Sequence, residues 1–200
     1  MIQHVIFDLS EVLIAGLVGI EKKLSGELGV PEDKVLPCFA GSWLEKLLIG
    51  NISEETFLTQ IVNRERWQTS IARLKTVIRQ NFCNKVEGSI DILMNLASHY
   101  ELALLSDHAA EWISYIKSIH SFLKVFEQTF FSYELKRTKK DPRTFCEVLD
   151  ALSIPSARCL FIDDNPENVQ VARSVGIPSI HFVNAGQLAT ELKSMGKLLS

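Results

Sequence analysis

Carboxylates follow two apolar segments that are predicted to be buried strands. Asp8 lies at the end of the segment 4–9, and Asp163 and Asp164 follow the segment 159–162. If these strands are neighbours in a parallel sheet, the three side chains share one crevice at its carboxyl edge. Each like-charge pair costs on the order of 4 kcal/mol at about 4 Å and an effective dielectric near 20, so all three require a cation to stay ionised. An oxygen-rich site of this kind suits Mg²⁺.

Two further features indicate a phosphate-bearing ligand beside such a cation. Ser106 ends an apolar segment and can donate its hydroxyl to a phosphoryl oxygen. Lys139 or Lys140, just before the predicted helix start at Asp141–Pro142, can neutralise phosphate charge. A carboxylate that attacks phosphorus needs a cation, a lysine and a hydroxyl nearby, because charge develops on the phosphoryl oxygens during transfer.

Short apolar runs alternate with helical patterns along much of the chain, which favours parallel strands joined by helical crossovers. The expected strands are His4–Leu9, Glu101–Ser106, Glu127–Phe131, Cys159–Ile162 and Ser179–Val183. The expected helices between them are Ala109–His120, Pro142–Leu152 and Pro166–Val175. The sequence therefore predicts an α/β core domain, to which we assign residues 1–14 and 86–200.

Residues 15–85 contain no convincing strand and are predicted to form an all-helical insertion. Ser53 is a suitable N-cap for one helix, and a second helix is expected over Ser70–Phe82 with Ile71, Leu74, Val77 and Ile78 inward. The residues Trp43, Leu44, Leu47 and Leu48 either line a ligand entrance or pack within the insertion, and the sequence favours neither alternative. We expect Trp112 and the pair Phe130–Phe131 to be core residues.

Composition and charge exclude several classes of protein. With 46% hydrophobic residues in 200, the chain can bury a real core, and its formal charge of -3 provides no positive field for nucleic acid or anionic lipid. The longest apolar run, Val12–Ile20, is too short to span a bilayer, and the first residues lack the pattern of a secretory signal. We therefore expect a cytoplasmic protein without membrane or nucleic-acid partners. The four scattered cysteines are expected to be reduced and mostly packed.

Four motifs, taken in their order along the chain, resemble those of the haloacid dehalogenase (HAD) superfamily of aspartyl-nucleophile phosphohydrolases. The motifs are FDLSEVL, then LLSD, then KKDP followed by TFCEVLDAL, and finally FIDDNPENV running on to ARSVGIPSI. The insertion after the first motif is similar to the small helical cap of the superfamily's first cap class. The phrase GNISEETF is most similar to the short sugar-phosphatase-like members.

The resemblance implies a Rossmann-like sheet in the order 3-2-1-4-5 and an Mg²⁺-dependent phosphatase of a small phosphorylated metabolite. Asp8 would be the nucleophile that forms an aspartyl-phosphate, Ser106 the hydroxyl that orients phosphate, and Lys139 the neutralising lysine. Asp164, Asp8 and the main-chain carbonyl of Ser10 would bind Mg²⁺, with Asp163 supporting them. The phosphate or substrate would contact Ser10, Ser106, Asp107 and Lys139. Whether the protein is a monomer or a dimer is left open.

The sequence departs from the family pattern at three positions. Ser10 stands where the family's phosphatases usually carry an acid/base aspartate, and losing such help costs roughly 10²- to 10⁴-fold in rate. Aryl or acyl phosphates should therefore react much faster than alkyl phosphates. Asp107 adds a negative charge that is unhelpful near phosphate unless it points away or pairs with a lysine, and Lys140 replaces a common proline.

Two interpretations follow from the missing aspartate. Glu11 and His108 are candidate replacements for the proton shuttle, although each is also typical of a surface residue. The alternative is a catalytically impaired relative that binds a phosphorylated ligand or a protein partner through the retained pocket. The paired Asp163–Asp164 argues against the dehalogenating branch of the family, which dispenses with the metal.

Overall fold

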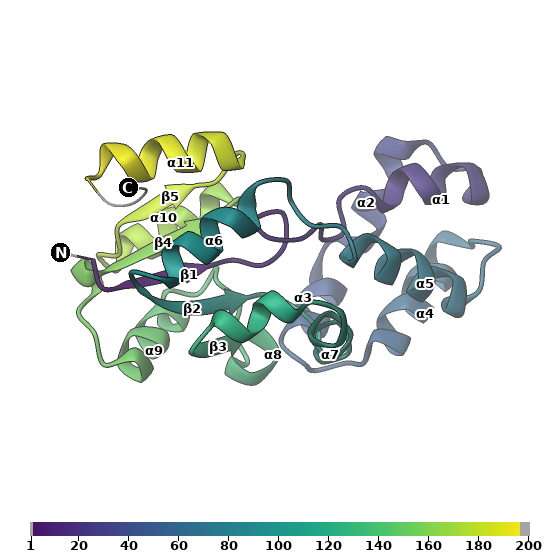
Figure 1. Cartoon of the computed structure of the whole chain (residues 1–200). Helices are drawn as coiled ribbons and strands as arrows, with labels where there is room; N and C mark the ends of the chain where they lie inside the picture. Colours follow the sequence, from purple (N-terminus) through teal and green to yellow (C-terminus); the bar gives the residue numbers. More distant parts are fainter. Residues whose placement is uncertain (1, 197–200) are drawn as a thin grey trace.

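A computed structural model describes residues 2–196, which contain a five-stranded parallel sheet in the order β3-β2-β1-β4-β5 (Figure 1). The strands are β1 (His4–Phe7), β2 (Glu101–Ser106), β3 (Gln128–Phe131), β4 (Cys159–Asp163) and β5 (Ser179–His181). The central strand β1 pairs with β2 on one side and with β4 on the other, with Phe7 opposite both Leu104 and Ile162. The predicted fold class and strand order are therefore confirmed.

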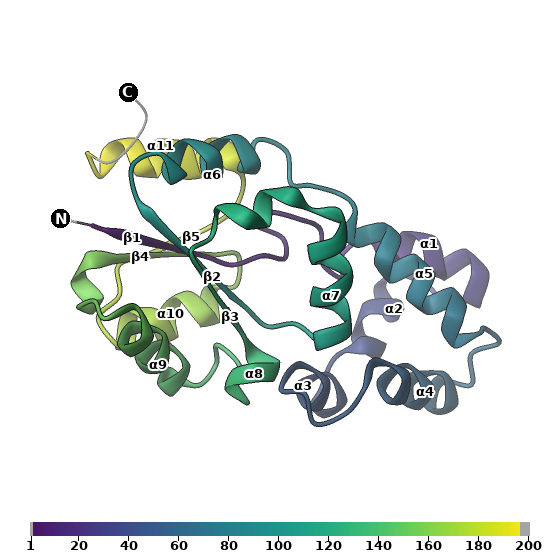
Figure 2. The same ribbon diagram turned by 60° about the horizontal axis from the view of Figure 1, so that its bottom comes forward.

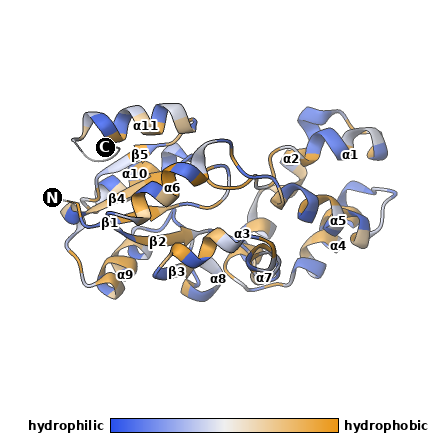
Figure 3. Cartoon of the chain, viewed as in Figure 1, coloured by the Kyte–Doolittle hydropathy of each residue, from blue (hydrophilic) through white to orange (hydrophobic). Residues whose placement is uncertain are grey.

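Helices cover both faces of the sheet, because alternate strand residues point to opposite sides (Figure 2). Val5 and Phe7 face the larger core cluster, with α6 (Ser89–Ala97), α7 (Ala110–Ile119) and α11 (Ala185–Ser194). Ile6 faces the smaller cluster, which is formed with α9 (Pro142–Leu152) and α10 (Pro166–Ser174). Apolar residues accordingly dominate β2 and β4 in the hydropathy colouring (Figure 3).

Three short helical elements complete the core. They are the 3₁₀ turns η1 (Ser121–Val125) and η2 (Ser156–Arg158) and the helix α8 (Ser132–Leu135). Helix α8 directly follows β3, so it lies at the carboxyl edge of the sheet where the candidate site is built.

Five helices between residues 15 and 85, here called the cap segment, lie beyond the carboxyl edge of the sheet (Figure 1). They are α1 (Ile20–Leu28), α2 (Glu32–Phe39), α3 (Ser42–Leu48), α4 (Glu54–Glu65) and α5 (Ile71–Phe82). The chain enters and leaves this segment on adjacent paths, since the amide of Ala15 donates to the carbonyl of Asn84 and that of Val86 donates to Leu13. The cap segment is therefore joined to the core by two stretches of chain that run side by side and are hydrogen-bonded to each other.

Most predicted elements occur within two residues of their expected bounds. The side chains of Ser53 and Ser70 accept hydrogen bonds from Thr56 and Arg73 and so cap α4 and α5. The sequence does not predict three helices of the core, namely α6, α8 and α11. Helix α6 begins after Gly88 without a side-chain cap, whereas α11 has a cap signal that was overlooked, because Asn184 accepts from the amide of Gln187.

The expectations about burial were confirmed in part. Trp112 and Phe131 lie in the core as predicted, and Ile71 and Phe130 are half-buried but pack against the core clusters, whereas the expectation for the cysteines was wrong. Of the four free cysteines, Cys159 alone is buried, whereas Cys83, directly after α5, and Cys146, on α9, are both exposed. Among residues 2–196, no helix is long and apolar enough to cross a membrane.

Candidate active site

Three carboxylates converge where β1 and β4 end. Asp8 directly follows β1, Asp163 ends β4, and the amide of Asp8 donates to the carbonyl of Ile162 at 2.9 Å. Oxygen atoms of Asp8, Asp163 and Asp164 all lie within 4.8 Å of one another. The parallel register of β1 and β4 causes this convergence, because it sets the two strand ends side by side.

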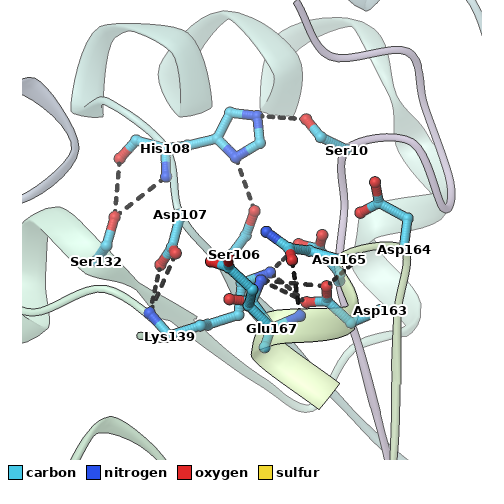
Figure 4. Close-up of polar contacts among 12 residues, drawn as sticks. Ser10, Ser106, Asp107, His108, Ser132, Lys139, Asp163, Asp164, Asn165 and Glu167 are labelled. Carbon is cyan, nitrogen blue, oxygen red and sulfur yellow. Dashed lines mark hydrogen bonds and ion pairs between the residues drawn. The ribbon is translucent and has the colours of Figure 1, made fainter. Parts of the chain in front are cut away.

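Lys139 supplies the positive charge at the centre of this cluster (Figure 4). Its ammonium Nζ lies 2.6 Å from Asp8 Oδ1 and 2.7 Å from Asp163 Oδ2, and the residue is 2% exposed. Burial alone would lower the pKa of Lys139, but the neighbouring Asp163, Asp8 and Asp107 outweigh that effect and raise it. Lys139 therefore stays charged, while the exposed Lys140 points to Glu167 at 4.0 Å. Of the two lysines that the sequence left open, Lys139 is the one in the site.

Asp163 is held by neutral donors as well as by Lys139. Its Oδ1 accepts from the amide of Asn165 at 2.8 Å, and the amide side chain of Asn168 donates to both carboxylate oxygens at 3.1 and 3.2 Å. Asn168 lies on α10 one turn after the strand end, so the helix fixes its direction. This contact makes Asp163 a buried support for the cluster, and sequence reasoning missed Asn168.

The charge balance of the cluster fits a bound divalent cation. Burial raises the pKa of Asp8, with Lys139 opposing it and Asp163 and Asp164 adding to it. Burial and Asp163 likewise raise the pKa of Asp164. One lysine therefore does not compensate three carboxylates, and Asp164 is the most accessible of them. Hard carboxylate oxygens at this spacing are the donor set that Mg²⁺ prefers.

His108 connects the hydroxyls of Ser10 and Ser106 (Figure 4). Its Nδ1 lies 2.7 Å from Ser106 Oγ, and its Nε2 lies 2.9 Å from Ser10 Oγ. Burial lowers the pKa of His108 to about 3, and the Lys139 charge acts in the same direction. The ring is therefore neutral near pH 7, donating through one nitrogen and accepting through the other. The surface alternative for His108 was wrong, because the residue is 3% exposed.

Asp107 does not point at the other carboxylates. Its two oxygens accept hydrogen bonds from the main-chain amide of Lys139, at 3.2 and 3.1 Å. Burial raises the pKa of Asp107, and Lys139 and Lys140 counteract the rise. The carboxylate thus positions the loop that carries Lys139 through the main chain, whereas the Lys139 ammonium pairs with Asp8 and Asp163.

Glu11 lies at the turn after Asp8 in a left-handed backbone conformation with φ 58°. Its Oε1 accepts from the amide of Gly16 at 2.7 Å, and burial raises the pKa of the half-buried carboxyl group. A Cβ at Gly16 would come within 2.8 Å of Ser10 Oγ and 2.9 Å of Glu11 Oε1. The start of the cap segment therefore approaches the site so closely that a side chain at position 16 would require Ser10 or Glu11 to move.

A hydrogen-bonded chain joins the cap segment to this site. The hydroxyl of Ser132, at the start of α8, donates to the carbonyl of Leu48 at 2.6 Å and accepts from the amide of His108 at 3.1 Å. Leu48 ends α3, so the loop that carries Ser106 and His108 is tied to a cap helix. The sequence offered no signal for Ser132, because its role depends on contacts between distant segments.

A cavity of about 460 Å³ opens between the carboxyl edge of the sheet and the cap segment. Asp8, Ser10, Asp107, Lys139 and Asp164 line one part of it. Leu44 and Leu48 of α3 line another part, whereas Leu47 is completely buried. Trp43 packs against the core cluster. Of the four apolar residues on α3, two therefore line the cavity and two pack inside the protein, so each of the two alternatives from the sequence holds for part of the group.

The structure brings together every residue that the sequence proposed for the site. Ser10 and Ser106 both contact the ring of His108. Lys139 contacts Asp8 and Asp163. Their roles in catalysis stay predictions. The arrangement can bind a cation and an anionic group side by side and can present one buried carboxylate to that group.

Comparison with known proteins gives a consistent family. Residues 39–182 match the haloacid dehalogenase-like hydrolase family. Flavin mononucleotide hydrolase 1 of Arabidopsis thaliana is 28% identical over 170 residues, which cover 84% of this chain and 68% of that protein. Acyl-CoA dehydrogenase family member 10 of Mus musculus is 26% identical over 210 residues, which cover 98% of this chain but 19% of that longer protein.

The fold is shared with solved structures as well. A HAD family enzyme of Bacteroides thetaiotaomicron, crystallised with magnesium and inorganic phosphate, superposes with a TM-score of 0.75 at 22% identity, covering 92% of this chain and 96% of that one. The match of 39–182 extends over more than half of the 200 residues and includes the segments that carry Ser106, Lys139 and Asp163. The chain therefore belongs to the haloacid dehalogenase-like hydrolase family.

Proposed function

We propose that the protein is an Mg²⁺-dependent phosphohydrolase that cleaves small phosphomonoesters through an aspartyl-phosphate on Asp8. The observation that carries this proposal is the buried Asp8 carboxylate, which contacts Lys139 at 2.6 Å and shares a space within 4.8 Å with Asp163 and Asp164. Both the Arabidopsis relative, named for hydrolysis of flavin mononucleotide, and the Bacteroides enzyme with magnesium and phosphate support it.

In the proposed mechanism, Asp8 attacks phosphorus through one carboxylate oxygen, and the bond between phosphorus and the ester oxygen breaks. The leaving group departs with the bonding electron pair and takes a proton from solvent water. Lys139 stabilises the negative charge that develops on the phosphoryl group. Water then attacks the aspartyl-phosphate, which regenerates Asp8 and releases inorganic phosphate.

The remaining site residues would hold the reactants in place. Asp8, Asp164 and the main-chain carbonyl of Ser10 would bind Mg²⁺, with Asp163 in support, and the ion would supply additional positive charge beside the phosphoryl oxygens. Ser106 would donate its hydroxyl to a phosphoryl oxygen while its Oγ accepts from Nδ1 of His108, which fixes the direction of that hydroxyl. Residues 15–85 would serve as the cap domain over this site, and 1–14 with 86–200 as the core domain.

The decisive experiment is a panel of phosphomonoesters, including flavin mononucleotide, p-nitrophenyl phosphate and hexose phosphates, assayed with and without Mg²⁺. Turnover should require Mg²⁺, and Asp8→Asn should reduce it by roughly 10⁴-fold or more, because the nucleophile is removed. Undiminished phosphate release by Asp8→Asn would refute the assignment of Asp8.

Ser10 favours a second candidate, an impaired relative that binds a phosphorylated ligand or a protein partner without turning it over. Ser10 Oγ contacts His108 Nε2, but a serine hydroxyl does not ionise near neutral pH and is a poor proton shuttle. Under this alternative, the parent protein releases no phosphate across the panel and Ser10→Asp gains activity. Robust turnover by the parent protein would eliminate the alternative.

A further inference from the structure

The cavity at the candidate site has a second wall whose chemistry differs from that of the phosphate end. Apolar side chains from the cap segment and from α7 form it: Leu17, Val18, Leu44, Leu48, Phe82 and Trp112. Leu17, Leu44 and Leu48 are half-buried, and Val18 is 56% exposed. We call this group the apolar wall.

The apolar wall begins next to the residues that would hold the phosphate. The ring of His108 lies 6.0 Å from that of Phe82 and 6.2 Å from that of Trp112, measured between centroids. The same His108 ring contacts Ser10 and Ser106. A phosphate bound near Asp8 would therefore place the group attached to its ester oxygen against this wall.

The charges around the cavity limit what that attached group can be. In the described part of the chain, the basic residues that line the cavity are Lys139 and Lys140, both from the loop before α9. Glu11 and Glu45 bring negative charge toward the cap side. A second anionic group on the ligand would thus find no cation beyond the phosphate end and would meet carboxylates instead.

We infer that the substrates of this site are phosphomonoesters whose leaving group is uncharged and apolar, with that group seated on the apolar wall. The inference rests on the proposed phosphohydrolase function and narrows it to one substrate class. Removing exposed apolar surface from water supplies the binding free energy, and Val18 with the half-buried Leu17, Leu44 and Leu48 has apolar surface to cover. Esters of polyols and of carboxylate-bearing alcohols are disfavoured by the same wall.

The first test compares esters whose leaving groups have similar acidity, so that chemistry and recognition are separated. The esters are 2-phenylethyl phosphate, glycerol 3-phosphate and 3-phosphoglycerate, all derived from primary alcohols. We expect KM for 2-phenylethyl phosphate to be roughly 10-fold or more below that for glycerol 3-phosphate, with 3-phosphoglycerate the weakest. An equal or lower KM for glycerol 3-phosphate would overturn the inference.

The second test uses two exposed valines as a matched pair. Val18 lies on the apolar wall, and Val183 is 64% exposed outside the cavity. We expect Val18→Ser combined with Leu44→Asn to raise KM for 2-phenylethyl phosphate roughly 10-fold and to leave inhibition by inorganic phosphate unchanged. Val183→Ser should change neither quantity. If Val183→Ser raised KM for 2-phenylethyl phosphate as much as the double variant at positions 18 and 44, the apolar wall would not be a specific binding surface.

A binding measurement separates failure of this inference from failure of the proposed function. Calorimetry with Mg²⁺ on the Asp8→Asn variant should show tighter binding of 2-phenylethylphosphonate than of methylphosphonate, again by roughly 10-fold. If phosphate and both phosphonates bind with equal affinity, the apolar wall is wrong and the phosphohydrolase proposal stands. If none of them binds and the parent protein cleaves no ester, both are wrong.

Discussion

The two ends of the cavity are built by different means. At the phosphate end, Asp8, Asp163 and Lys139 are almost completely buried and contact one another, and the sheet positions them. At the cap end, Leu44 and Val18 keep part of their surface exposed and lie on a short helix and a connecting segment. The phosphate end is therefore organised before any ligand arrives, whereas the cap end has surface that a ligand must cover.

The contacts that join the cap segment to the core differ in kind from both ends of the cavity. Glu54, at the start of α4, is 2% exposed. Its carboxylate accepts two hydrogen bonds from Arg79 and a third from Trp112 Nε1 at 2.8 Å. Trp112 belongs to α7 of the core, so this buried cluster fixes the cap segment to the sheet layer. The two ends therefore differ in kind, since buried charges form one and partly exposed apolar side chains form the other, and a few buried polar groups join the cap segment to the core.

The largest expected effect comes from the lysine at the phosphate end. Lys139→Met should lower kcat/KM by roughly 10²- to 10³-fold, since it removes the buried charge beside Asp8. It should also reduce the free energy of unfolding by about 3–5 kcal/mol, because Asp8 and Asp163 lose their partner. Mg²⁺ should restore part of that stability, as measured by urea unfolding with and without the ion.

The neighbouring lysine is the control for this prediction. The side chain of Lys140 is 60% exposed, and its Nζ lies 4.0 Å from Oε2 of Glu167, which is 72% exposed. Lys140→Met should leave the free energy of unfolding unchanged to within about 0.5 kcal/mol. Equal losses from the two substitutions would show that position 139 has no special place in the site.

The next effect tests the tie between cap and core. Glu54→Ala leaves Arg79 and the Trp112 N–H without their partner, and we expect it to cost about 3–5 kcal/mol of unfolding free energy. The adjacent Glu55 pairs on the surface with Lys75, so Glu55→Ala should cost less than about 1 kcal/mol. Similar values for the two variants in chemical denaturation would argue against a buried tie.

A smaller effect is expected from the histidine between the two ends. His108→Leu removes the contacts that direct Ser10 and Ser106, and should lower kcat roughly 10- to 100-fold with little change in KM. His108→Gln retains one polar contact and should recover part of kcat. His99→Leu, on an exposed turn, is the control and should leave kcat unchanged. A change confined to KM would instead indicate a role in ligand binding.

The smallest effects come from two glycines. Gly16→Ala places a methyl group within 3 Å of Ser10 and Glu11 and should destabilise the protein by about 1–3 kcal/mol. Gly26→Ala in α1 meets no atom within 4 Å and should stabilise the helix by up to about 1 kcal/mol. Thermal unfolding of both variants checks the opposite signs, and a stabilising Gly16→Ala would contradict the close approach of the cap segment to the site.

Much of the fold and the site could be predicted from local sequence. Short apolar runs located each of the five strands of residues 2–196, and the carboxylates at two strand ends predicted a cation site. Helix α6 was missed because it follows Gly88 without a capping side chain. The residues alone left Lys139 and Lys140 open and the family resemblance favoured Lys139, which the structure places against Asp8 and Asp163.

The sequence by itself determined the strand order of the family it resembles, the chemical types at each strand end and the length of the helical insertion. The tertiary structure alone decided which side chains meet across that order. His108 became a buried link between Ser10 and Ser106, Ser132 a link to Leu48, and α3 contributed both core and cavity residues. Periodicity is a local property of the chain, whereas burial and hydrogen-bond partners depend on residues far apart in it.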